Sequence, residues 1–140
     1  MARVLALDYG TKRTGIAVTD PLQMIATSLT TVRSHLLFEF LDNYLKNEKV
    51  ERFVLGKPTT MNNLPSENAK YVDIFEKQCK AKYPHIPITL IDERFTSKMA
   101  HQTLIDSGVK KIKRQNKEII DTISATIILQ SYMEQKNNGL

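Results

Sequence analysis

The sequence predicts a single α/β domain, residues 1–140, built on a mixed β-sheet with helices on both faces. Two observations predict this class. Three stretches with strand patterns precede the first helical pattern, and strands and helices then alternate along the rest of the chain. The chain of 140 residues is 41% hydrophobic, which suffices for one core. The expected element order is βββαβαβαα, with the first three strands antiparallel.

The first half of the chain predicts a β-hairpin, a third strand and a helix. Residues 3–7 predict a first strand, residues 10–13 a turn, and residues 14–19 an alternating stretch, which places Asp8 at the tip of a hairpin. Residues 25–32 predict the third strand. Ser34 can cap a helix whose apolar positions fall on one face, namely Leu36, Leu37, Phe40, Leu41, Tyr44 and Leu45.

The second half alternates between strands and helices. A short strand over residues 52–55 ends at a Gly-Lys-Pro segment, and a polar loop over 59–65 precedes a helix over 66–82. Residues 88–91 predict the next strand, which ends in Asp92 and Glu93. Thr96 or Ser97 caps a helix that stops at Gly108, and a last helix covers residues 118–135. The sequence contains no linker, repeat or low-complexity segment.

Composition excludes several classes of protein and site. No apolar run reaches the roughly 18 residues that a membrane-spanning helix needs, and the N-terminus lacks a signal-peptide pattern, so we expect a cytoplasmic protein. A single cysteine, Cys79, excludes an intramolecular disulfide, and three scattered histidines give no zinc spacing. Any bound metal should therefore have oxygen ligands. The net charge of +5 suits an anionic partner but does not by itself identify one.

Three acidic residues lie where a strand ends or a helix begins. Asp8 and Glu93 follow strands, and Asp121 lies early in the last helix, where it could point across the sheet edge toward them. Ligands of α/β sheets gather at such strand ends. The three together predict a divalent-metal site. The alternatives are a turn-forming role for Asp8, Asp92 in place of Glu93, and a helix-dipole role for Asp121.

Such a site suits hydrolysis of phosphodiesters. Two Mg²⁺ ions about 3.5 to 4 Å apart can activate water, neutralise the phosphate and stabilise the leaving oxygen. Mg²⁺ prefers oxygen ligands, keeps several waters and is typically bound by one or two carboxylates plus substrate phosphate. We therefore expect Mg²⁺ as cofactor, with Mn²⁺ able to substitute.

Basic residues near these acids are candidates for binding nucleic acid. The stretch 110–117 carries five cations just before Asp121, and those expected to contact phosphates are Lys110, Lys111, Lys113 and Arg114. Lys12 and Arg13 in the hairpin turn and Arg94 beside Glu93 could add backbone contacts. The alternative for the basic stretch is a solvated loop, and Arg94 could instead brace the site.

The chain resembles the YqgF-type family of pre-16S rRNA nucleases, a Holliday-junction-resolvase-like branch of the ribonuclease H-like superfamily. The resemblance covers nearly the whole chain and rests on residues 7–17 (LDYGTKRTGIA), 55–58 (LGKP), 92–97 (DERFTS) and 120–125 (IDTISA), followed by 128–130. It implies a ribonuclease H-like fold and catalytic metal ligands at Asp8, Glu93 and Asp121. Resolvase relatives often add a ligand one turn before the last aspartate, where this chain has Glu118. One departure is Asn62-Asn63, where the family usually has a glycine.

The expected function is therefore that of a metal-dependent nuclease acting at the 5′ end of small-subunit rRNA precursor. The preference for RNA comes from the resemblance, because phosphate and metal contacts carry no base identity. Alternatives are a Holliday junction resolvase acting on branched DNA and a non-catalytic RNA-binding or ribosome-associated module. Expected partners are rRNA precursor and ribosomal particles, with the chain a monomer or a homodimer. An actin-like ATPase shares the first hairpin but needs a second domain, which a chain this short cannot hold.

Overall fold

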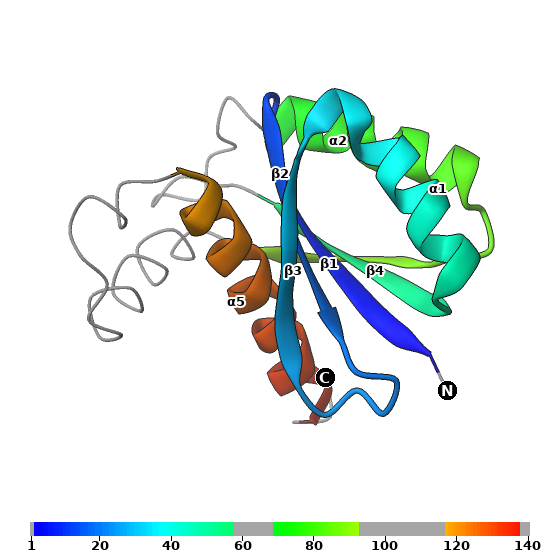
Figure 1. The fold of residues 1–140 in the computed structure, drawn as a ribbon, viewed down its shortest axis with the longest axis vertical. Coiled ribbons are helices and arrows are strands. Elements are labelled where there is room, and N and C mark those ends of the chain that lie inside the picture. The colour runs from blue at the N-terminus through cyan, green and yellow to red at the C-terminus, as the bar shows by residue number, and fades with distance from the viewer. Residues whose placement is uncertain (1, 58–68, 93–116, 138–140) are drawn as a thin grey trace.

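The computed structural model describes residues 2–57, 69–92 and 117–137, and within them a mixed five-stranded sheet with three α-helices (Figure 1). The elements are β1 Arg3–Tyr9, β2 Arg13–Thr19, β3 Ala26–Arg33, the 3-10 helix η1 Ser34–Leu36, α1 Leu37–Asn47, β4 Val50–Lys57, α2 Ala69–Lys82, β5 Ile88–Asp92 and α5 Lys117–Asn137. The predicted fold class is confirmed. The helix expected after Thr96 or Ser97 lies outside the described residues.

The strand order across the sheet is β3-β2-β1-β4-β5. β1 pairs antiparallel with β2, and β2 with β3, as the hairpin pattern predicted. β4 is parallel to β1, and β5 is parallel to β4. The three parallel strands therefore end at one edge of the sheet, at Tyr9, Lys57 and Asp92, which we call the carboxyl edge.

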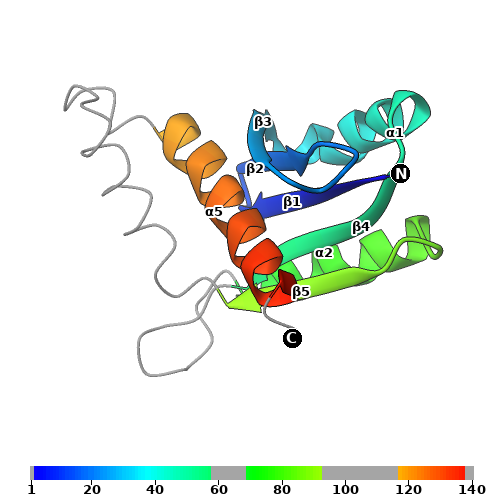
Figure 2. The same cartoon turned by 90° about the horizontal axis from the view of Figure 1, so that it is seen from below.

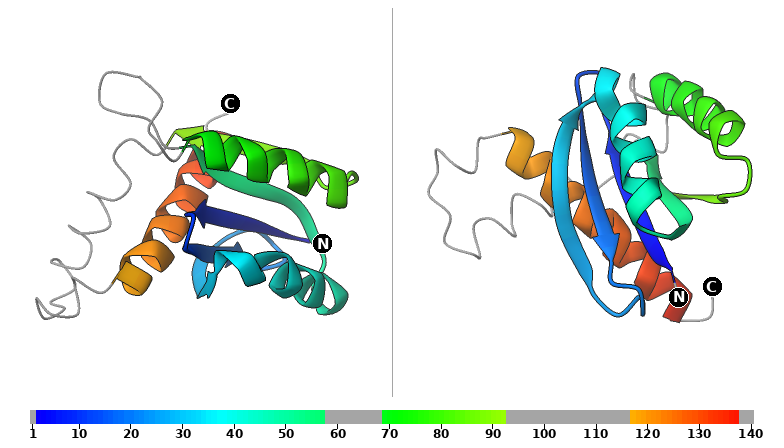
Figure 3. Two further views of the ribbon diagram at one scale, coloured as in Figure 1. Left: turned by 90° about the horizontal axis from the view of Figure 1, so that it is seen from above. Right: turned by 45° about the vertical axis from the view of Figure 1, so that its right-hand side comes forward.

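Helices cover both faces of the sheet, which explains the continuous apolar run in β1. α1 and α2 lie on one face, and α5 crosses the other (Figures 2 and 3). Leu5 and Leu7 of β1 pack in the cluster that includes residues of α1 and α2, whereas Val4 and Ala6 pack with Ala125, Ile128 and Leu129 of α5. Successive residues of β1 thus alternate between the α1–α2 face and the α5 face.

Ser34 does not cap a helix, and that prediction was wrong. α1 begins at Leu37 after η1, and neither helix has a side-chain cap. The Ser34 hydroxyl instead donates to the carbonyl of Gly10 and lies 2.9 Å from the Thr14 hydroxyl. Gly10 lies in the β1–β2 turn and Thr14 near the start of β2, so Ser34 connects the end of β3 to the tip of the hairpin.

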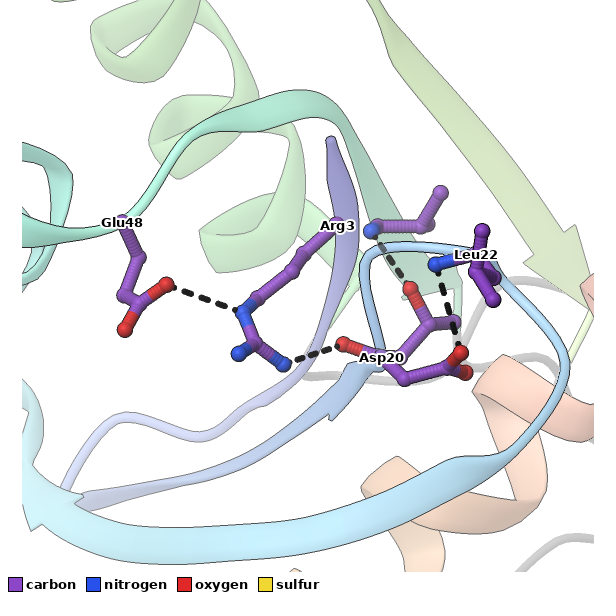
Figure 4. A network of polar contacts seen from close by, with 6 residues as sticks. Arg3, Asp20, Leu22 and Glu48 are labelled. Atoms are coloured by element: carbon purple, nitrogen blue, oxygen red, sulfur yellow. Dashed lines mark hydrogen bonds and ion pairs between the residues drawn. The ribbon is translucent and has the colours of Figure 1, made fainter. Parts of the chain in front are cut away.

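The opposite edge of the sheet, where β1 begins, is closed by a polar network (Figure 4). The Arg3 guanidinium binds the Glu48 carboxylate at 3.1 Å and the Thr19 carbonyl at 2.9 Å. The Asp20 carboxylate accepts hydrogen bonds from the backbone N–H groups of Leu22, Met24 and Ile25, which fixes the β2–β3 loop. In the described part of the chain, no helix is both long and apolar enough to span a membrane.

Candidate metal and nucleic-acid site

Asp8 lies at the carboxyl edge, one residue before the end of β1, with a partly exposed side chain. Because Val4 and Ala6 face α5, the period of two along a strand places Asp8 on the α5 face. The next residue, Tyr9, faces the other way and stacks on Phe75 of α2 with 4.6 Å between ring centroids. Burial raises the pKa of the Tyr9 hydroxyl. This stacking holds the end of β1, and with it Asp8, against the core.

The strand neighbours of Asp8 are glycines on both sides. Asp8 pairs with Gly15 of β2. On the other side Leu7 pairs with Leu55 of β4, so the residue beside Asp8 is Gly56. Neither of these two glycines has a side chain, so the two residues directly beside Asp8 add none on the α5 face.

β5 brings its own end to the same edge. Gly56 pairs with Ile91, and Lys57 pairs with Asp92. Ile91 packs in the cluster on the α5 face, whereas Ile88 packs against the cluster on the α1–α2 face. Glu93 follows directly after β5 and lies outside the described residues.

The first turns of α5 reach the carboxyl edge. The Lys136 ammonium donates to Gln23 at 2.9 Å, and Gln23 donates to the Ala2 carbonyl at 3.0 Å, so the end of α5 lies where β1 begins. The helix therefore begins at the opposite end of the sheet, as Figures 1 and 2 show.

A contact between two hydroxyls shows which part of α5 lies over which part of the sheet. Thr126 lies 2.8 Å from Ser28 of β3, which pairs with Ala17, which in turn pairs with Ala6 of β1. Asp121 precedes Thr126 by five residues, or about 7.5 Å of helix. Asp8 follows Ala6 by two residues, or about 7 Å of strand. Asp8 and Asp121 therefore both lie toward the carboxyl edge from the Thr126–Ser28 contact, with Glu118 nearly one further turn along.

The structure thus describes only part of the predicted acidic set. It describes the Asp8 side chain and the α5 backbone at Glu118 and Asp121. Among the side chains it describes, no three acidic, histidine or cysteine residues form a metal-binding group. Convergence of the three carboxylates stays a prediction.

Two of the predicted cationic residues lie at the hairpin tip that follows Asp8, Lys12 in the β1–β2 turn and Arg13 at the start of β2. Lys12 is exposed and Arg13 is partly exposed. The turn is held by hydrogen bonds from the Gly10 N–H to the Arg13 carbonyl, 3.0 Å, and from the Ser34 N–H to the Lys12 carbonyl, 2.9 Å. The other predicted cations, Arg94, Lys110, Lys111, Lys113 and Arg114, lie outside the described residues.

One cation at this edge was not among the sequence-based candidates. Lys57 ends β4, partly exposed and paired in register with Asp92. The sequence feature that could have identified Lys57 is its position in the Gly-Lys-Pro segment that ends a predicted strand. Parallel strands bring the residues at their carboxyl ends to the same edge of the sheet, where ligands bind.

Comparisons with known proteins identify the family. A family model described as "RuvX: Holliday junction resolvase" matches residues 2–135. A Bacteroides fragilis protein is 54% identical over 136 residues, which are 97% of this chain and 99% of that protein. A Christiangramia forsetii protein is 56% identical over 133 residues, which are 95% and 98% of the two chains. Both are named "Putative pre-16S rRNA nuclease". The resemblance inferred from the motifs is therefore confirmed, and the chain belongs to the RuvX family of nucleases, which has the ribonuclease H-like fold.

Proposed function

We propose that this protein is a Mg²⁺-dependent phosphodiesterase that processes the 5′ end of small-subunit rRNA precursor. The observation that carries the proposal is the position of Asp8 at the carboxyl edge, between two glycines and at the end of the sheet where α5 begins. The names of the relatives support rRNA precursor as substrate. Such a substrate implies action in the cytoplasm, with ribosomal particles as a further partner.

Asp8, Glu93 and Asp121 are the proposed metal ligands, and Glu118 is a further candidate. Ile91 packs on the α5 face, the face on which Asp8 also lies. The period of two along a strand therefore favours Glu93, two residues after Ile91 in the sequence, over Asp92. The donor set consists of carboxylates, which suits Mg²⁺ or Mn²⁺. When bound, two such ions supply an activated water and neutralise charge on the phosphate and the leaving oxygen.

The cations hold the substrate in this proposal. Hydrogen bonds to Ser34 and Gly10 fix the backbone of Lys12 and Arg13. Contact of these two residues with phosphates beside Asp8 would therefore cost only the conformational entropy of their side chains. Lys57 can do the same from the end of β4. The proposed set is completed by Arg94, Lys110, Lys111, Lys113 and Arg114.

A junction resolvase is the second candidate, favoured by the description of the matching family model. A resolvase that makes paired cuts in a four-way junction needs two active sites related by symmetry, hence a dimer. A strictly monomeric protein would count against this candidate. A non-catalytic ribosome-associated module is the third, and it predicts binding of RNA without cleavage.

The deciding experiment is a cleavage assay with Mg²⁺ or Mn²⁺ on two substrates, a labelled pre-16S leader RNA and a four-way DNA junction. We expect the RNA to be cut and Asp8→Asn to abolish cutting while leaving the fold intact. Asp73→Asn, which neutralises an exposed aspartate on α2, is the matched control and should cut normally. Normal turnover by Asp8→Asn would refute the assigned site, and symmetric nicking of the junction alone would favour the resolvase.

A further inference from the structure

Ser124 of α5 carries a buried hydroxyl that has no hydrogen-bond partner among the described residues. Its side chain is 1% exposed. The other two fully buried polar side chains in the described part of the chain are both paired. Thr19 accepts a hydrogen bond from the Val4 N–H at 2.9 Å, and Thr14 lies 2.9 Å from the Ser34 hydroxyl. Because buried hydroxyls are nearly always hydrogen-bonded, an unpaired one points to a ligand.

The position of Ser124 on the helix directs it away from β3. Thr126, two residues on, binds Ser28 of β3. Residues two apart are separated by about 200° around a helix, so Ser124 lies on nearly the opposite flank from Thr126. Since the sheet order is β3-β2-β1-β4-β5, that flank faces the side on which the parallel strands lie.

Ser124 also lies close to the carboxyl edge. It is about 3 Å nearer that edge than Thr126, measured along the helix axis. Asp121 precedes it by three residues, a spacing that puts both residues on the same side of the helix. The unpaired hydroxyl therefore lies about one helical turn from Asp121, one of the proposed metal ligands, on the helix that begins at the carboxyl edge.

We infer that Ser124 is a positioning residue whose hydroxyl hydrogen-bonds the water shell that a divalent cation retains at the carboxyl edge. This inference rests on the proposed function. Mg²⁺ and Mn²⁺ sites that use few carboxylates keep several waters, and those waters need protein partners. Residues that hold the outer shell of a metal site typically change its affinity 10- to 100-fold when removed.

The test compares Ser124→Ala with the unmodified full chain in two measurements. The first is a titration of Mn²⁺ binding, in which electron paramagnetic resonance measures the free ion. We expect the dissociation constant to rise about 10-fold. The second is thermal unfolding without metal, where we expect an unchanged or higher Tm, because the substitution removes a polar group that is unpaired in the folded protein.

Thr126→Val is the matched control, since it removes a hydroxyl from the same helix on the flank that binds β3. It should leave Mn²⁺ affinity unchanged. Ser124→Cys serves as a second variant of similar size, and its weaker hydrogen bonding should lower the affinity to a smaller extent.

The outcomes separate the inference from the proposed function. Unchanged Mn²⁺ affinity in both Ser124 variants would overturn the inference while leaving the metal site in place. A clearly lower Tm of metal-free Ser124→Ala would also overturn it, because the hydroxyl would then have a partner within the protein. Absence of Mn²⁺ binding by the unmodified chain would overturn the proposed function, and the inference with it.

Discussion

Replacing Gly10 with alanine should destabilise the β1–β2 turn that lies beside Asp8. A Cβ atom at residue 10 would lie 2.7 Å from the carbonyl oxygen of Arg13. Real Cβ atoms essentially never come this close to another heavy atom, and a backbone carbonyl cannot rotate away as a flexible side chain can. The turn must therefore open for the alanine to fit.

The expected loss of stability follows from the bonds that the turn would strain. Opening works against the hydrogen bond from the Gly10 N–H to the Arg13 carbonyl, which is 3.0 Å long, and against the bond from Ser34 to the Gly10 carbonyl. Each contributes about 1 kcal/mol, so the free energy of unfolding should fall by about 2 kcal/mol. In a chain of 140 residues that loss lowers Tm by about 6 °C.

Thermal unfolding followed by circular dichroism measures this shift. Lys12→Ala is the matched control, because Lys12 is exposed in the same turn and its truncation should move Tm little. Gly10→Ala should also weaken Mn²⁺ binding, since Asp8 lies only two residues away. A Tm within about 1 °C of that of the unmodified chain, less than the loss of one such hydrogen bond would cause, would refute the reasoning from the turn bonds.

Three further predictions concern pH, thiol reactivity and salt. The hydrogen bond from Tyr83, together with Lys82, lowers the pKa of Asp42 below its ordinary value of 3.8. The ionised Asp42 carboxylate should therefore stabilise the fold above pH 3.8, and this stabilisation should be lost as the pH falls further. The Tm difference between the unmodified chain and Asp42→Asn should shrink on acidification below pH 3.8. Burial, and to a lesser extent Glu76, raises the pKa of the Cys79 thiol to about 12. Ellman's reagent at pH 8 should therefore react with this thiol only slowly until guanidinium unfolds the chain. Rapid reaction of the folded protein would contradict the burial of Cys79. Neutralising Lys110, Lys111, Lys113 and Arg114 should weaken RNA binding and make it less dependent on salt. The slope of log K against log [salt] should become less steep by about 0.7 for each phosphate of a single strand that the protein no longer neutralises. An unchanged slope would favour the alternative, a solvated loop.

Strand patterns predicted which residues end at the carboxyl edge, because they depend on local periodicity. The apolar run that precedes Asp8 predicts a buried strand followed by a turn, and β1 does end at Tyr9. The last predicted helix, residues 118–135, matches α5, whose bounds are Lys117–Asn137. These features follow from which side chains must leave water, a property that neighbouring residues express in sequence.

Residues with short polar side chains were harder to assign from sequence. Ser34 had the local signature of a helix cap, but its hydroxyl binds Gly10 and Thr14, which lie 24 and 20 residues away. A hydroxyl takes whichever partner the fold brings near, and local sequence cannot rank a distant partner against a near one.

The sequence by itself determined the α/β class, the family and the acidic residues offered as metal ligands. Only the tertiary structure decided that Asp8 shares a face with α5, that glycines flank it on both sides, and that Ser124 is buried without a partner among the described residues. The period of two fixes which residues of a strand share a face, but not which helix covers that face. Strand register and helix placement come from packing between segments far apart in the chain, so the surroundings of a site residue become known only once those segments are in contact.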